Sequence, residues 1–258
     1  MRPGRLYWLG ASVLFTAALL AVWQLASDFR LVSPVFMPSP LRAWNALVFN
    51  FTEGVLGQRV LLTLQHMFFG WLLASAAGVA IGALIGISPF ARTYLAPSLE
   101  FFRPLPASAV FPVAIAFIGL SENMVLFVIA FGALWPTLLS TINGFATIKP
   151  RLDEFARLIG LSRWQYIMQI ALPNALPDIL AGMRLSLTIA LILSVTGEIL
   201  SGSPGLGHWI LLQARGFRSP DLFAGVLLFG VIGYASSQLV ALLEARLLRW
   251  RGDSFGRM

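Results

Sequence analysis

Ionisable side chains inside long apolar segments are the residues of this sequence best placed to do chemistry. Glu198 lies near the end of such a segment, and an ionisable group at membrane depth is costly and usually functional. Ser186 and Ser194 share a helical ridge with it, because four-residue spacing keeps side chains on one face of a helix. Two interpretations stay open. Glu198 lines a solute path or its outer gate, together with the two serines, or it is bonded to a neighbouring helix or placed at the membrane interface.

Histidine and cysteine usage predicts no metal site. The two histidines, His66 and His208, are far apart in the sequence and lack carboxylates at ligand spacing. The chain has no cysteine, which excludes thiolate ligands and a cysteine nucleophile. We therefore expect His66 to be a satisfied interface residue and His208 to belong to a docking surface in a loop.

The sequence patterns of nucleotide binding and hydrolysis are also absent. A phosphate-binding loop needs glycine, lysine and then serine or threonine, and the single lysine, Lys149, lies between Ile148 and Pro150. Neither H-E-x-x-H nor G-x-S-x-G occurs in the sequence. We expect that this chain is not an enzyme and that it binds no cofactor itself.

The most specific pattern lies in the charged segment 144–176. Its members are Glu154, Ala156, Gly160, Ile170, Leu172 and Pro173. Gly160 allows a sharp turn or a positive φ after a first short helix. Ser162 is a suitable N-cap for a second short helix over 163–170, which we expect Pro173 to end. The segment is thus predicted to be a helix–turn–helix.

This pattern resembles the EAA loop of ABC-importer permeases, with Phe155 where that family usually has alanine. The resemblance implies that the segment is a coupling helix bound by a separate ATPase subunit, which holds ATP and magnesium. The predicted contact surface consists of apolar anchors beside two arginines: Leu161, Trp164 and Ile167 with Arg157 and Arg163. An amphipathic helix lying on lipid is the alternative interpretation.

The resemblance covers about residues 70–250 and is greatest to the nitrate, sulfonate and taurine branch of these permeases. The supporting segments are 97–100, 103–106, 182–184, 197–198, 205–207 and 247–250. It implies import of a small organic or inorganic anion, such as a sulfonate, taurine or nitrate. A thiamine-precursor pyrimidine or an aromatic acid is the alternative solute. A secondary transporter is a more remote reading, because it would need carboxylates at mid-membrane and Glu198 is off-centre.

Composition identifies the elements that must position these residues. Apolar residues make up 58% of the chain and charged residues 11%, which is too few charges to cover a water-facing surface. Long unbroken apolar runs indicate membrane helices rather than a barrel. We predict an all-α polytopic membrane protein of the type I ABC importer permease kind. Its six expected spans are 6–26, 60–87, 105–120, 124–143, 179–200 and 222–243.

The remaining segments complete a three-part organisation. Residues 1–59 hold the first span and an outer segment with an interfacial helix near 40–51, residues 60–250 form the permease core, and 251–258 are a tail. A polar connection is expected over 88–103. One ridge of small residues at four-residue spacing should let another helix approach closely: Gly70, Ala74, Gly78, Gly82 and Gly86.

Charge asymmetry predicts the orientation in the membrane. Thirteen of the 18 lysines and arginines fall on the side that would hold both termini and the segment 144–176, and five on the other. The positive-inside rule then places both termini in the cytoplasm of a bacterial inner membrane. The expected partners are an ATPase dimer, a second permease copy that makes a homodimeric pore, a periplasmic binding protein and lipid, but no nucleic acid.

Overall fold

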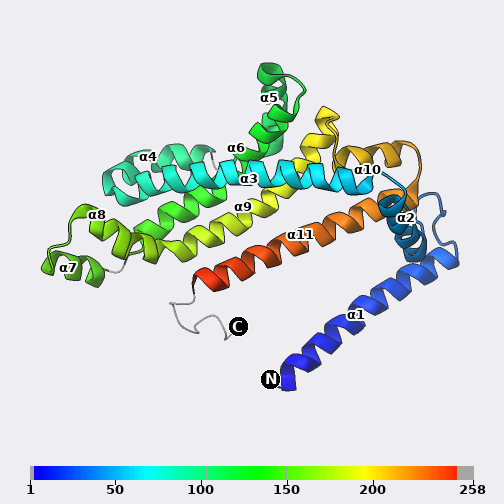
Figure 1. Ribbon diagram of the computed structural model, residues 1–258, viewed down its shortest axis with the longest axis horizontal. Helices are drawn as coiled ribbons and strands as arrows, with labels where there is room; N and C mark the ends of the chain where they lie inside the picture. Colours follow the sequence, from blue (N-terminus) through cyan, green and yellow to red (C-terminus); the bar gives the residue numbers. More distant parts are fainter. Residues whose placement is uncertain (1–2, 103, 149, 249–258) are drawn as a thin grey trace.

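The structure is a computed structural model that describes residues 3–102, 104–148 and 150–248. Those residues form helices, turns and loops without any strand, so the predicted all-α class is confirmed (Figure 1). The long helices are α1 (Pro3–Asp28), α3 (Leu56–Ile87), α6 (Glu122–Ala146), α9 (Leu172–Ser201) and α11 (Ser219–Leu247). The shorter ones are α2 (Pro40–Thr52), α4 (Pro89–Phe102), η1 (Ala107–Val110), α5 (Phe111–Ile118), α7 (Pro150–Leu158), α8 (Arg163–Tyr166), η2 (Ile167–Ala171) and α10 (Leu206–Arg215).

Five of the described helical segments are long and apolar enough to cross a membrane. They contain five of the six expected spans, and the expected third span, 105–120, is not among the helices of membrane length. Its residues form η1 and α5, of four and eight residues. Twelve residues rise about 18 Å at 1.5 Å each, well short of a hydrocarbon core about 30 Å thick.

The third crossing is instead made in two pieces. Helices α3 and α6 run parallel, as the successive pairs Gly70–Ile129, Gly78–Thr137 and Gly86–Phe145 show. The chain must therefore return along the bundle between them. It does so through α4 and then η1 and α5, so the connection expected over 88–103 contains the helix α4. Pro104 and Pro106 lie between the pieces, where proline disfavours continued helix.

Small residues bring α3 and α6 into backbone contact. All five members of the predicted ridge are buried. A Cβ added at Gly82 would lie 2.7 Å from the Thr141 Cβ and 2.8 Å from the Leu138 carbonyl oxygen. Nothing larger than glycine therefore fits this position without a shift of α6, which explains the residue type.

Helix α9 runs antiparallel to α6 and closes the core. Gly144 faces Ala175 near one end of the pair and Gly132 faces Leu193 further along it. Trp71 of α3 donates its indole N–H to the Met183 carbonyl oxygen at 2.9 Å, which joins α3 to α9. The three helices α3, α6 and α9 thus form the packed centre of the molecule.

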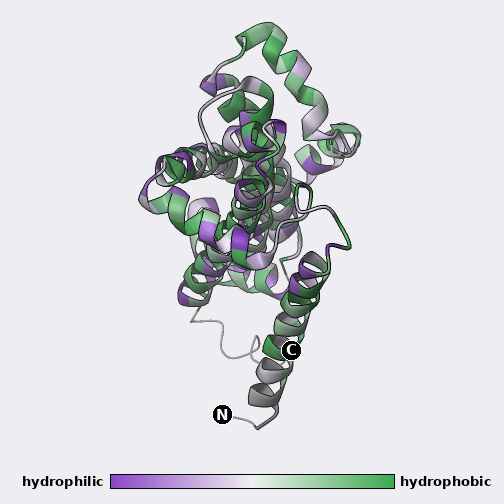
Figure 2. Cartoon of the chain, turned by 90° about the vertical axis from the view of Figure 1, so that its right-hand side faces the viewer, coloured by the Kyte–Doolittle hydropathy of each residue, from purple (hydrophilic) through white to green (hydrophobic). Residues whose placement is uncertain are grey.

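The outer helices pack loosely against this centre. Much of α11 is exposed and α1 diverges from the bundle (Figure 1). Figure 2 shows hydrophobic residues along the outer surfaces of the helices as well as between them. Exposed side chains such as Leu72, Ile192 and Val231 have no place in water, which fits a lipid environment or a further protein subunit.

Helices α2 and α10 lie at the end of the bundle opposite α7 and α8 (Figure 1). A helix is present where one is expected at 40–51, as α2, with Ser39 capping it by accepting from the Arg42 N–H at 3.3 Å. Its place at the membrane interface stays a prediction. Asn50 of α2 donates to the Asp221 carboxylate of α11 at 2.7 Å. These contacts fix α2 against the start of α11.

Candidate functional site

The segment 150–173 forms a compact helical loop at one end of the bundle, called the coupling loop below. Helix α7 ends at Leu158, and Gly160 follows with φ of +67°. A Cβ at Gly160 would meet nothing within 4 Å, so the positive φ, not crowding, requires glycine. The turn closes when the Leu161 N–H donates to the Ala156 carbonyl oxygen at 3.1 Å.

Ser162 caps α8 as the sequence predicts. Its hydroxyl accepts from the Gln165 N–H at 3.3 Å, while the Ser162 N–H donates to the Gln165 side-chain oxygen at 2.9 Å. This reciprocal pair is a capping box, which fixes the start of the helix without help from the rest of the protein.

The expectation that Pro173 ends the second helix is wrong. Helix α8, the π-helical turn η2 and α9 form one helical segment over Arg163–Ser201. The Leu172 N–H donates to the Ile167 carbonyl oxygen, five residues back, and Pro173 then stands in the first turn of α9. Proline has no N–H to donate to a carbonyl oxygen of the preceding turn. The π turn changes the hydrogen-bond pattern just before Pro173, so the helix continues without that donor. The coupling loop is therefore continuous with a membrane helix.

The predicted contact residues of the coupling loop differ in exposure. Ala156 is buried, whereas Leu161, Ile167, Ile170, Leu172 and Pro173 are half-buried. The exposed members are Glu154, Arg157, Gly160, Ser162, Arg163 and Trp164. Phe155, Leu158 and Ile159 are exposed as well, although the sequence did not single out the last two as anchors. An exposed apolar surface beside two arginines suits a groove on another protein.

A hollow of about 770 Å³ separates this loop from the turn between α3 and α4. Its lining includes Ser88 and Pro89 on one side and Arg157, Arg163 and Tyr166 on the other. The coupling loop and the start of α4 thus line opposite sides of one hollow.

Glu198 is fully buried where α3, α9 and α10 meet. One carboxylate oxygen accepts from the Thr63 hydroxyl and from the Gly207 N–H, each at 2.9 Å. The other lies 3.0 Å from Nδ1 of His66. Thr63 also accepts from the Leu206 N–H at 2.8 Å. This is the interpretation in which Glu198 is bonded to a neighbouring helix, and a role in the solute path stays a prediction.

Sequence reasoning missed the partnership of Glu198 with Thr63 and His66. These two are three residues apart on α3, a spacing that places both on one face. The glycine at position 205 was a further signal in the sequence. The structure gives its reason, because a Cβ at Gly205 would lie 2.1 Å from the Glu198 carboxyl carbon. Neither signal names Glu198 without the tertiary contact.

Ser186 and Ser194 both lie in the interior of the bundle. The Ser186 hydroxyl donates to the Ala133 carbonyl oxygen of α6 at 2.5 Å, and that of Ser194 to the Leu191 carbonyl oxygen at 2.9 Å. Both are fully buried, and neither belongs to the groove described next. Their predicted place on the solute path stays a prediction.

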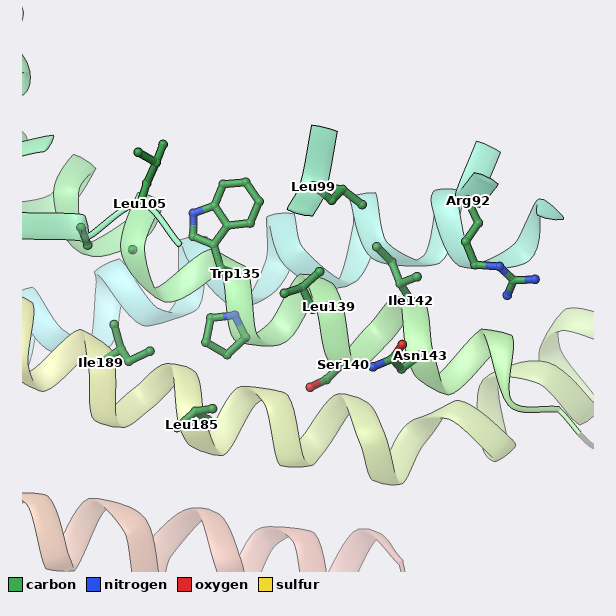
Figure 3. Close-up of a pocket in the computed structure, with 13 residues that line it drawn as sticks. Arg92, Leu99, Leu105, Trp135, Leu139, Ser140, Ile142, Asn143, Leu185 and Ile189 are labelled. Carbon is green, nitrogen blue, oxygen red and sulfur yellow. The ribbon is translucent and has the colours of Figure 1, made fainter. Parts of the chain in front are cut away.

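A groove of about 710 Å³ lies between α4, α6 and α9 (Figure 3). Its wall is mostly apolar and includes Leu99, Leu105, Trp135, Leu139, Leu185 and Ile189. Arg92 and Asn143 lie together at one end of the view and Leu105 and Ile189 at the other. The polar end is the one toward the coupling loop, since it holds the first turn of α4 and the last turns of α6.

Some predicted residues lie outside the described part of the chain. The tail 251–258 is among them. So are six of the basic residues counted for orientation: Arg2, Arg103, Lys149, Arg249, Arg251 and Arg257.

Membrane-length helices around a tightly packed centre, with a helical loop exposed at one end, define a polytopic membrane transport subunit. The family model described as binding-protein-dependent transport system inner membrane component matches residues 74–249. The chain belongs to this family. Membership makes it the permease component of an ABC importer and confirms the resemblance drawn from the coupling loop.

Three relatives show which branch of the family is similar. An aliphatic sulfonates transport permease, SsuC of Bacillus subtilis (strain 168), is 35% identical over 99% of this chain and 93% of its own length. The taurine transport permease TauC of Escherichia coli (strain K12) is 27% identical over 92% of this chain and 88% of its own. The nitrate import permease NrtB of Synechococcus elongatus is 28% identical over 86% of this chain and 84% of its own length. The predicted nitrate, sulfonate and taurine branch is confirmed.

Solved structures share the fold. A chain of the MetNI methionine ABC transporter in an inward-facing conformation aligns with a TM-score of 0.63 at 19% identity, over 76% of this chain and 95% of that one. A chain from an amino acid ABC transporter aligns with a TM-score of 0.59 at 15% identity, over 81% of this chain and 95% of that one. The predicted type I importer architecture is thereby confirmed.

Proposed function

We propose that two copies of this chain form the pore of an importer for small organic anions, with an ATPase dimer bound at the coupling loops. The observation that carries the proposal is the exposed apolar surface of the coupling loop, with Trp164, Leu158 and two arginines. Such a surface has no role in a monomer. A partner groove that receives it would link ATP hydrolysis to the membrane helices.

The remaining parts of the assembly follow from this arrangement. ATP and magnesium would be held by the ATPase subunits, because the sequence of this chain has no phosphate-binding loop. A periplasmic binding protein would deliver the solute at the α2 and α10 end. Both termini would lie in the cytoplasm, on the side of the coupling loop.

The names of the relatives support the solute class. SsuC is described for aliphatic sulfonates, TauC for taurine and NrtB for nitrate, and all three solutes are small anions or carry an anionic group. We infer that this chain also passes a small anion, and that a sulfonate fits best because the relative with 35% identity is the sulfonate permease.

Uptake by the assembled transporter tests this function. We expect the genes next to this one to encode an ATPase and a binding protein, and these three proteins would be reconstituted in lipid vesicles. Radiolabelled butanesulfonate or taurine should accumulate with ATP and the binding protein, and Trp164→Ala should reduce accumulation at least tenfold. Accumulation of a pyrimidine or an aromatic acid, with no anion transported faster, would contradict the proposed solute class.

A further inference from the structure

Three polar side chains of the groove have no partner within the described part of the chain. Arg92 makes neither an ion pair nor a hydrogen bond through its guanidinium there. Ser140 and Asn143 likewise make no side-chain hydrogen bond among the described residues. Arg92 and Ser140 are half-buried and Asn143 is exposed, so their polar groups are open to water or to a ligand in the groove. Their common place in one hollow indicates a wet or occupied site.

These groups line the same groove from two elements, although the Ser140 side chain lies against Gly182 of α9. Ser140 and Asn143 are three residues apart on α6 and therefore share a face of that helix. Arg92 lies in the first turn of α4, on the opposite wall of the same end of the groove (Figure 3). Among the described lining residues it is the only charged one. A hydroxyl, an amide and a guanidinium together supply hydrogen-bond donors and positive charge, which suits an anion.

The rest of the groove offers an apolar surface of fitting length. Leu139, Trp135 and Leu105 follow the polar end along the wall, with Leu185 and Ile189 across from them (Figure 3). A volume of about 710 Å³ lies within the usual range for small-molecule sites, about 300–1,000 Å³. Nitrate has no apolar part to use this wall, whereas a short alkanesulfonate has both a charged head and an apolar chain.

We propose that this groove is a solute-contact site for an organic anion, in which Arg92, Asn143 and Ser140 contact the charged head and the leucine and isoleucine wall contacts the apolar chain. The inference rests on the proposed function as an anion importer. It adds the residues that select the charge of the solute, and it places the polar contact toward the cytoplasmic end of the path.

Charge-selective labelling tests the site without any solute assay. The chain has no cysteine, so Ser140→Cys introduces a single thiol. The assembled transporter is prepared in inverted membrane vesicles. The Ser140→Cys thiol is labelled there with an anionic methanethiosulfonate that carries an ethylsulfonate group, and separately with a cationic one that carries a trimethylammonium group. The anionic reagent should react faster, and adding Arg92→Gln should lower the anion-to-cation rate ratio about fivefold. Arg92→Lys should preserve most of the ratio, which separates charge from folding.

Two controls confine the effect to the groove. Ser162→Cys on the exposed coupling loop should show no change in the ratio when Arg92→Gln is added. Arg42→Gln, which removes an exposed arginine from α2, should not alter the ratio at Ser140→Cys.

Three results would overturn the inference. The ratio at Ser140→Cys could be near one, or it could be unchanged by Arg92→Gln. The thiol could also be inaccessible to both reagents, which would mean that a second copy of the chain fills the groove. Because labelling does not depend on uptake, a transporter that passes this test but imports no anion would contradict the proposed function alone.

Discussion

Glu198 joins three segments that are far apart in the sequence. Its carboxylate receives hydrogen bonds from Thr63 of α3 and from the backbone of Gly207 at the start of α10, and it meets His66. A fully buried carboxylate is stable only when its oxygens are satisfied in this way. The cluster therefore ties α10 to the bundle at the end where solute would be delivered.

Replacing Glu198 tests this role. Glu198→Ala leaves the Gly207 N–H without an acceptor, leaves the Thr63 hydroxyl only the Arg59 carbonyl oxygen, and opens a cavity, so we expect a loss of about 3 kcal/mol in unfolding free energy. Glu198→Gln keeps the shape and one acceptor oxygen, so it should lose about 1 kcal/mol. Thermal unfolding of the detergent-solubilised protein measures both.

Uptake by the same variants addresses the predicted gate. If the charge of Glu198 serves the solute path, Glu198→Gln should transport poorly although it folds. Uptake at the rate of the unmodified protein would remove the gate prediction and leave Glu198 as a structural residue.

Gly160 is the residue on which the shape of the coupling loop depends. Its φ of +67° costs a residue with a Cβ about 1–2 kcal/mol, and a β-branched residue more. Gly160→Val should reach the membrane yet lose co-purification with the ATPase and transport. Gly160→Asn is the matched control, because asparagine tolerates this conformation. Normal transport by Gly160→Val would argue against the coupling role of the loop.

At the scale of elements, the continuity of the coupling loop with α9 decides how force could travel. The segment Arg163–Ser201 is one helical unit with a π turn between α8 and α9. A displacement of α8 would reach α9 through this turn, which is a point where helices bend readily. The same segment contains Glu198, so one continuous helical segment joins the two ends of the molecule.

Packing between α3 and α6 gives an element-scale prediction. Gly82→Ala places a Cβ 2.7 Å from the Thr141 Cβ and should cost about 1–3 kcal/mol of unfolding free energy, measured by thermal unfolding. Gly230→Ala on α11 is the control, because a Cβ there meets nothing within 4 Å and alanine favours helix. Equal stabilities of the two variants would show that α3 and α6 do not pack as described.

At the scale of the whole molecule, the predicted six crossings require one crossing made of shorter helices, because only five described helical segments have membrane length. The third crossing is divided between α4 and the pair η1 and α5. An even number of crossings puts the first and last helices' free ends on the side of the coupling loop. The predicted orientation depends on this count, not on the length of the third span.

Single cysteines test the orientation. Ser162 on the coupling loop and Ala214 on α10 are both exposed and lie at opposite ends of the bundle. In intact cells an impermeant maleimide should label Ala214→Cys, and it should label Ser162→Cys only after permeabilisation. The protein without cysteine is the blank. Labelling of Ser162→Cys in intact cells would reverse the predicted topology.

The sequence by itself determined the features that depend on local or periodic physics. Apolar runs of sufficient length predicted the long helices, because hydrocarbon accepts a backbone only when its hydrogen bonds are satisfied within the segment. Four-residue spacing of glycine marked the face of α3 that meets α6. The turn at Gly160 and the helix cap at Ser162 could be predicted, because a positive φ and a capping box involve only neighbours in the chain.

Tertiary structure alone decided the features that join distant residues. The parallel arrangement of α3 and α6 requires the chain to return along the bundle between them, and no local pattern encodes that arrangement. Pro173 lies within a continuous helix because a π turn compensates for it. Glu198 meets Thr63 across 135 positions of sequence. Spacing reports which residues share a face of one helix, but contact between helices depends on how their surfaces pack, and that is settled only in the folded bundle.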